Sequence, residues 1–218
     1  MNITAVTISR QPETIDFDLP FYCHTEGYRP IHHRDNESPE RIQYLTRRYT
    51  DAVNHALDQH PETEHIMIID SYYLHQPPVR ILLTHYSQLE NSILGASIWF
   101  HDQTHLRPYI IYYETLSVRE LAGKRWKTVG ALPSGLIEVG AVGACWIFPR
   151  KLWRGKFNIV KGGLVNSTCV DNDGCQVLLD CDVRLWRSAK DGSGIPAYSI
   201  LKRLRVSAGE QRRKILGW

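Results

Sequence analysis

The residue with the clearest chemical potential is Asp70, whose carboxylate directly follows the apolar run at residues 66–69. Packing gives no reason for a charge at the end of a buried strand. In open α/β sheets, however, ligands bind just beyond the carboxyl ends of the strands, so we expect Asp70 to contact a ligand. The alternative is that Asp70 caps the turn that follows it, because Asp and Ser side chains commonly bond to turn backbone.

A second candidate is the stretch at residues 135–148, which is apolar enough to predict a strand. Gly140 and Gly143 lie inside it. A glycine inside a strand marks a bulge or a place where another group closely approaches the backbone. The stretch therefore either lines a ligand site or packs tightly against the rest of the fold.

The elements that must position these residues alternate along the first half of the chain. Apolar and β-branched residues predict strands at residues 3–8, 66–69 and 93–100, and apolar stripes of helical period predict helices at residues 38–59 and 79–89. Strands that alternate with helices favour right-handed crossovers and a mainly parallel sheet.

The second half is expected to complete the same domain. It predicts strands at residues 109–113 and 195–206, a helix that begins at 149–153, and a helix at 174–190 that contains Asp180 and Asp182 as surface charges. Residues 13–37 predict an irregular surface segment. The fold class is therefore α/β: a single domain at residues 1–206 with a mainly parallel twisted sheet flanked by helices, then a basic tail at 207–218.

The order of these elements resembles the GT-A fold of glycosyltransferases, which transfer a sugar from a nucleotide-sugar donor. The family's Ala- and Asn-rich helix, and its apolar strand that ends in an Asp-x-Asp motif, match residues 52–57 and 66–72. The resemblance implies that Asp70 holds a divalent cation, Mn²⁺ or Mg²⁺, on the donor diphosphate. Tyr72 stands in place of the second acid, so a metal would depend on Asp70, phosphate oxygens and water, which Mg²⁺ accepts. Arg10 follows the first strand, where this fold meets the nucleotide, and could pair with phosphate or stack on the base.

Two further segments follow the order of the same family. A Gly-rich strand that ends in an arginine matches residues 138–150, so Gly140 and Gly143 would lie against the donor sugar. An acidic pair before a helix matches Asp171 and Asp173. The resemblance implies that one of them, preferably Asp173, deprotonates the acceptor hydroxyl, which requires hydrogen-bond reach to that proton. The alternative for both acids is an N-cap.

The basic residues of the chain concentrate at its C-terminus. The 218 residues carry a formal charge of +3, but residues 198–218 hold six Lys or Arg and one Glu, which leaves −2 for the rest. A body that is not basic argues against duplex nucleic-acid binding. The tail itself could contact an anionic membrane, bind nucleic acid or remain solvated.

The cysteines and apolar stretches indicate a cytoplasmic protein. The spacing of the five cysteines matches neither a metal knuckle nor a disulfide framework, so we expect buried apolar residues. The N-terminus has no signal pattern. No apolar stretch reaches the roughly 20 residues that a membrane-spanning helix needs.

The expected activity is the transfer of a sugar from a nucleotide-sugar donor to a hydroxyl of an unknown glycan, lipid or protein acceptor. The charge of the leaving diphosphate must be balanced by a metal ion or by basic side chains. Two alternatives remain. One is a nucleotidyltransferase or another nucleotide-binding enzyme on a related fold, and the other is a catalytically inactive binding protein whose basic tail contacts nucleic acid or a membrane.

Overall fold

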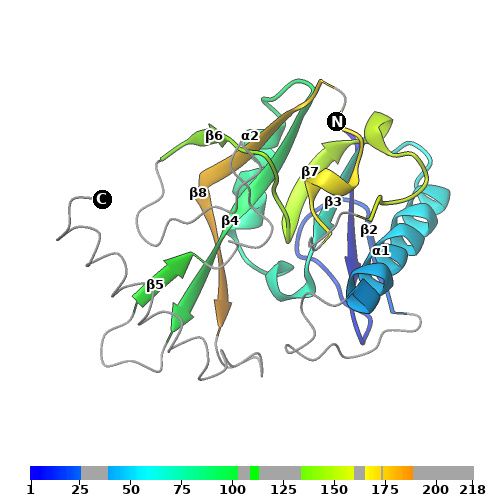
Figure 1. Cartoon of the computed structure of the whole chain (residues 1–218), viewed down its shortest axis with the longest axis horizontal. Helices are drawn as coiled ribbons and strands as arrows, with labels where there is room; N and C mark the ends of the chain where they lie inside the picture. Colours follow the sequence, from blue (N-terminus) through cyan, green and yellow to red (C-terminus); the bar gives the residue numbers. More distant parts are fainter. Residues whose placement is uncertain (26–38, 103–108, 113–133, 160–164, 173, 189–218) are drawn as a thin grey trace.

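The computed structural model describes residues 1–25, 39–102, 109–112, 134–159, 165–172 and 174–188 (Figure 1). Within these residues, eight strands form one sheet. The strands are β1 (Ile3–Ile8), β2 (Phe21–His24), β3 (His65–Ile69), β4 (Ser92–Asp102), β5 (Tyr109–Tyr112), β6 (Leu136–Glu138), β7 (Cys145–Pro149) and β8 (Gln176–Ser188). The helices are α1 (Pro39–Gln59) and α2 (Pro78–Tyr86), with the 3-10 turns η2 (Ser71–Tyr73), η3 (Arg150–Leu152) and η4 (Ser167–Cys169). The strand predicted at 195–206 and the basic tail at 207–218 lie outside the described residues.

The sheet is mixed, so the predicted α/β class is confirmed but the expectation of a mainly parallel sheet is wrong. Its strand order is β2-β1-β3-β7-β4-β8-β6, with β5 beside β4. The pairs β1–β2, β1–β3 and β4–β8 are parallel, whereas β3–β7, β4–β7, β4–β5 and β6–β8 are antiparallel. The difference arises because β7 inserts in the opposite direction between β3 and β4. A short apolar run that is buried on both faces gives no indication of its direction.

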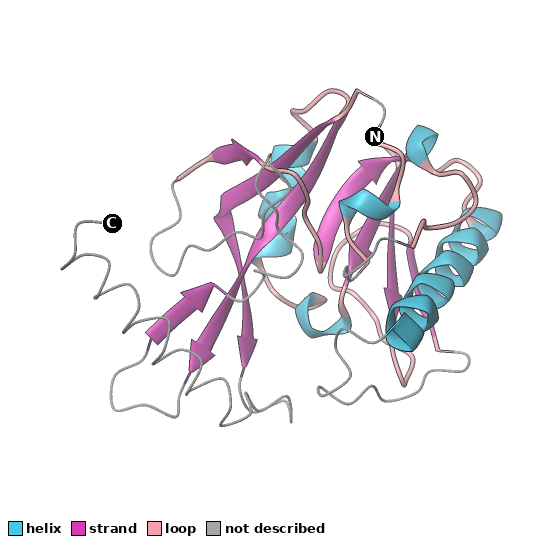
Figure 2. Cartoon of the chain, in the orientation of Figure 1, coloured by secondary structure: helices cyan, strands magenta, loops and turns pink. Residues whose placement is uncertain are grey.

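The two helices cover opposite faces of the sheet (Figure 2). We call the face under α1, which carries Ile68 and Trp146, the α1 face. The opposite face, which carries Met67 and Ile147 and packs against α2, is the α2 face. Successive strand residues point to opposite faces, so the buried strands supply both cores. Within the described residues, no helix combines the length and the apolar character needed to cross a membrane.

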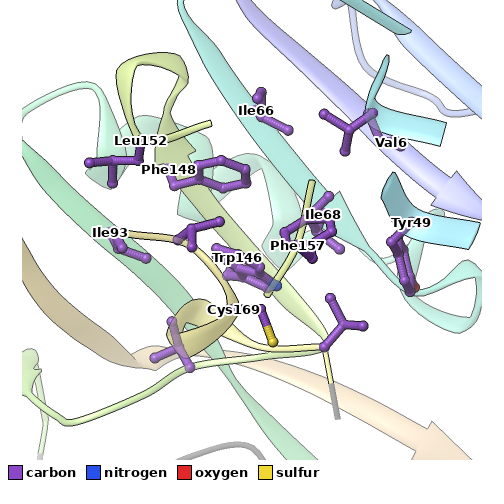
Figure 3. Close-up of a cluster of buried hydrophobic side chains, with 14 of the residues drawn as sticks. Val6, Tyr49, Ile66, Ile68, Ile93, Trp146, Phe148, Leu152, Phe157 and Cys169 are labelled. Carbon is purple, nitrogen blue, oxygen red and sulfur yellow. The ribbon is translucent and has the colours of Figure 1, made fainter. Parts of the chain in front are cut away.

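The α1-face core extends beyond the helix itself. Its aromatic centre includes Trp146 and Phe148, whose ring centroids lie 4.8 Å apart, with Phe157 beside them (Figure 3). The loop before β7 lies over β4, and a Cβ atom on Gly95 would stand only 2.4 Å from the Val142 Cβ. Gly95 is therefore required for this loop to close over the sheet.

The pattern of apolar residues predicts most elements of the first half of the chain correctly. The predicted strands at 3–8, 66–69 and 93–100 are β1, β3 and β4, and the predicted helices are α1 and α2, with ends that differ by a few residues. The expectation of an irregular segment at 13–37 is wrong in part, because four of its residues form β2, which pairs with β1. This short strand is only half buried, so it lacks a strong apolar pattern.

The second half departs further from the expectations. The single strand predicted at 135–148 divides into β6 and β7, separated by a loop in which Ala144 adopts a φ of 58°. The helix expected from residue 149 is only the turn η3. The helix expected at 174–190 is wrong, since these residues form β8. Its residues 181–186 alternate between buried and exposed, which is the period of a strand and not of a helix.

A bulge interrupts the pairing of β8 with β4. Ala96 pairs with Asp180, but the next residue of β4, Ser97, pairs with Arg184. The extra residues of β8, 181–183, form the bulge between these two positions. The Ser97 hydroxyl donates a hydrogen bond of 2.8 Å to the carbonyl of Val183 within it, so the bulge is bonded to its neighbour strand.

The buried carboxylate of Asp180 stabilises this bulge by hydrogen bonds to its backbone. Its Oδ1 accepts hydrogen bonds from the backbone N–H groups of Asp182 and Val183, at 3.1 and 3.2 Å. Its Oδ2 lies 2.6 Å from Nδ1 of His85 on α2. The expectation that Asp180 is a surface charge is therefore wrong, because its side chain is fully buried and bonded. Asp182 is exposed, as expected of a surface charge, but on a strand.

All five cysteines lie in the described residues, and none forms a disulfide. The expectation of buried residues is confirmed for Cys145, Cys169 and Cys181, whereas Cys23 and Cys175 are half-buried. Burial raises the pKa of the first three thiols, that of Cys181 to about 11. These three side chains therefore stay protonated and act as small apolar residues.

Candidate functional site

Asp70 lies at the carboxyl ends of two neighbouring parallel strands, β1 and β3. It directly follows β3, which is parallel to β1 and antiparallel to β7. Since β7 is also antiparallel to β4, strand β4 runs in the direction of β3. β4 continues to Asp102, beyond the level of Asp70, so we call the side of the sheet at which β1 and β3 end the carboxyl edge. Ligands of open α/β sheets bind at such an edge.

The Asp70 carboxylate is oriented by a residue that is distant in sequence. The hydroxyl of Tyr49 on α1 donates a hydrogen bond of 2.6 Å to Asp70 Oδ1. The half-buried side chain therefore points toward the α1 face. The turn η2 begins directly behind Asp70, yet the Asp70 side chain makes no capping hydrogen bond to it. The alternative that Asp70 serves as a side-chain cap for this turn is not what the geometry shows.

The structure brings the glycine-containing stretch to the same place. The Ala144 carbonyl accepts a hydrogen bond of 2.8 Å from the Asp70 N–H. Gly143, one residue earlier, is buried and forms a β-bridge with Asn166. Gly140 is half-buried and lies further back in the loop that leads to β7. Of the two predicted glycines, Gly143 is therefore the one beside Asp70.

Arg10 and Tyr72 also lie near the carboxyl edge. Arg10 is exposed and follows the end of β1 by two residues. Tyr72 is the middle residue of η2, with 48% of its surface exposed, while Tyr73 and Leu74 behind it are buried under the α2 face. The turn thus fixes its backbone in the core and presents the Tyr72 ring outward.

The two predicted general bases lie elsewhere or outside the described residues. Asp173 falls outside them. Asp171 is exposed before the start of β8, with its Oδ2 4.0 Å from Nε of Arg154. Because β8 is parallel to β4, its start lies at the edge opposite the carboxyl edge. The structure therefore does not bring Asp171 together with Asp70.

The described residues provide at most a partial metal site. Among them, no three His, Cys, Asp or Glu side chains are grouped so that they could hold a metal ion. Burial raises the pKa of Cys145, and the nearby Asp70 carboxylate raises it further, so this thiol is a poor ligand. Within the described part of the chain, Asp70 thus offers a carboxylate but not a full ligand set, which fits Mg²⁺ bound largely by phosphate and water.

Sequence reasoning missed the side chains that position this site. Tyr49 was expected only as part of an apolar stripe. Gln76 makes the other long-range link, since its carboxamide bonds to the backbone of both Tyr72 and Trp186. No local pattern marks such contacts. The alternation at residues 181–186 would have placed Trp186 on a strand, but not next to Gln76.

Comparisons with known proteins add no assignment. No model of a known protein family matches the chain, and a search of curated proteins finds no significant relative.

Proposed function

We propose that the chain transfers a sugar from a nucleotide-sugar donor to a hydroxyl acceptor. The proposal is supported above all by the position of Asp70, a carboxylate that follows β3 at the carboxyl edge and accepts a hydrogen bond from Tyr49. An acid held at this edge, beside the backbone of Gly143, suits a ligand that carries both hydroxyls and phosphate. The GT-A resemblance supplies the class of reaction.

Asp70 has two ways to act on such a donor. As a carboxylate, it accepts hydrogen bonds from ribose or sugar hydroxyls directly. A divalent cation bound there would neutralise charge on the departing diphosphate. In either case Tyr49 keeps one carboxylate oxygen directed toward the α1 face, and Gly143 offers backbone without a side chain. Arg10, at the end of the neighbouring β1, can pair with a phosphate oxygen.

Activation of the acceptor stays a prediction. A base must come within hydrogen-bond reach of the attacking hydroxyl. Asp171 lies toward the opposite edge beside Arg154, and β8 starts at that same edge five residues later. Asp173, outside the described residues, stays a prediction as the base of an inverting reaction. A retaining reaction would need neither residue.

A thermal-shift screen with nucleotide sugars, with and without Mn²⁺, tests the proposal. A ligand present at 100 times its dissociation constant raises the unfolding free energy by about 2.7 kcal/mol. Asp70→Asn should reduce that shift, whereas the exposed Glu138→Gln on β6 should retain it in full. Release of free sugar from the bound donor would then establish reactivity at the anomeric carbon.

The same screen separates the alternatives. Stabilisation by nucleoside triphosphates, with no response to nucleotide sugars, would point to a nucleotidyltransferase or another nucleotide-binding enzyme. Binding of nucleotide sugars without any turnover, in the presence of candidate acceptors, would point to an inactive binding protein. Binding that survives Asp70→Asn unchanged would contradict the proposed site.

A further inference from the structure

The part of β8 beyond its bulge presents two exposed side chains on one face. Arg184 and Trp186 are exposed. Val183, which precedes Arg184, and Leu185, which lies between the two, are buried in the core of the α2 face. Residues two apart on a strand share a face. Arg184 and Trp186 therefore point to the α1 face, which is also the face toward which the Asp70 carboxylate is directed.

A carboxamide ties this part of β8 to the turn that follows Asp70. Gln76 Nε2 donates hydrogen bonds to the carbonyls of Tyr72, at 3.2 Å, and Trp186, at 2.6 Å. Gln76 Oε1 accepts a hydrogen bond of 2.8 Å from the Trp186 N–H. Ser71, Tyr72 and the Gln76 side chain thus link Asp70 to the backbone of Trp186, although the two residues are 116 positions apart in the sequence.

The bulge fixes the position from which Arg184 extends. Arg184 is the first residue after the bulge to resume pairing, opposite Ser97. The bulge is held by the buried Asp180 carboxylate and by the Ser97 hydroxyl. The Arg184 side chain therefore extends from a backbone that is paired with β4 and follows a hydrogen-bonded bulge, at the level where β3 has ended.

We propose that Arg184 and Trp186 bind the phosphate and the base of a nucleotide whose sugar end lies at Asp70. The ligand class rests on the proposed function, but the residues follow from the geometry above. Guanidinium groups bind phosphate oxygens through two parallel hydrogen bonds. An indole face stacks on any nucleobase. Arg184 thereby supplies positive charge that the single carboxylate of Asp70 cannot, and a diphosphate is held without a metal ion.

Titration calorimetry in EDTA, with the full chain, tests this assignment. The probes are UDP, GDP, ADP and inorganic pyrophosphate. Arg184→Ala should weaken binding of pyrophosphate and of the preferred nucleoside diphosphate at least tenfold, and Arg184→Lys should restore part of it. Trp186→Ala should weaken only the nucleoside diphosphate, by about tenfold, because pyrophosphate has no base to stack. Unfolding temperatures of the variants check that the fold is retained.

Lys151→Ala is the matched control, since Lys151 is an exposed cation in η3, which follows β7 at the opposite edge. Its binding should equal that of the wild type. Unchanged affinities in Arg184→Ala and Trp186→Ala, or binding that appears only when Mn²⁺ replaces EDTA, would overturn the assignment. If the assignment of Arg184 and Trp186 is overturned but nucleotide sugars are still turned over, the proposed function is retained without that assignment. If binding needs both Arg184 and Trp186 but no sugar is transferred, this assignment is supported and the proposed function is contradicted. No binding of any probe would remove both.

Discussion

The Tyr49 hydroxyl on α1 donates a hydrogen bond of 2.6 Å to Asp70 Oδ1 at the end of β3. The two residues belong to different layers, the helix and the sheet, and the bond joins them at the carboxyl edge. It links the stability of the fold to the orientation of the carboxylate that carries the proposed function.

Tyr49→Phe should therefore lower both stability and ligand affinity. Hydrogen bonds to charged groups contribute about 1.5–3 kcal/mol, and Tyr49 is almost fully buried, so the unfolding free energy should fall by about 1–2 kcal/mol. Nucleotide-sugar affinity should fall because the carboxylate loses its fixed orientation. Urea unfolding and calorimetry measure the two effects. A variant with wild-type affinity would show that Tyr49 serves stability alone.

Gly95→Ala should destabilise the fold through a direct clash. The added methyl group would stand 2.4 Å from the Val142 Cβ, much closer than two carbon atoms can approach. Overpacking of this kind costs about 1–3 kcal/mol. A double-mutant cycle with Val142→Gly checks the cause, since the two changes should cost less together than the sum of their separate costs. Additive costs would place the strain elsewhere.

The elements that sequence reasoning located correctly are those whose pattern is local. The stripe of α1 and the apolar run of β3 repeat within a single segment, so their type and position can be recognised without knowledge of the partners. The position of Asp70 at a strand end could be predicted for the same reason. The direction of β7 could not, because its pairing depends on a loop and on neighbouring strands.

β8 is an element whose type was predicted wrongly from the sequence, as a helix instead of a strand. Residues 177–181 are all buried, so they show no period that distinguishes a strand from a helix. The alternation of residues 181–186 was the usable signal. Burial of Asp180 could not be predicted, because its partner His85 lies 95 residues away and approaches only when α2 packs on the α2 face.

Asp180→Ala should be among the most destabilising single changes in the described residues. It removes the acceptor of the Asp182 and Val183 N–H groups and the partner of His85 Nδ1. A buried donor that loses its acceptor costs about 1–3 kcal/mol, and two backbone N–H groups lose theirs here. Asp182→Ala is the control and should cost less, since that side chain is exposed and accepts one hydrogen bond, from the Gly135 N–H. Equal losses in urea unfolding would exclude a special role for Asp180.

Gln76→Leu should uncouple β8 from the turn behind Asp70 while the side chain keeps a similar volume. Three hydrogen bonds to the backbone of Tyr72 and Trp186 are lost. We expect a stability loss of about 1–3 kcal/mol. Nucleoside diphosphate affinity should also fall, because the backbone that carries the Trp186 ring loses its hydrogen bonds to Gln76. Gln88→Leu is the control, as Gln88 is an exposed residue beyond α2. An intact affinity in Gln76→Leu would show that the link does not support binding.

The pH dependence of stability should carry a contribution from His65. Its Nδ1 lies 2.9 Å from the buried Tyr86 hydroxyl. Burial lowers the pKa of His65; the Glu64 carboxylate partly opposes this shift, and the N-terminal ammonium adds to it. The unfolded chain, with a His pKa of about 6.5, therefore binds more protons than the folded chain as pH falls below that value. Stability from His65 is fully present above about pH 6.5 and is lost as pH falls through the lowered pKa of the folded state. Urea unfolding between pH 5 and 8 should show a shallower rise with pH in His65→Gln than in the wild type, and parallel profiles would mean that His65 titrates alike in both states.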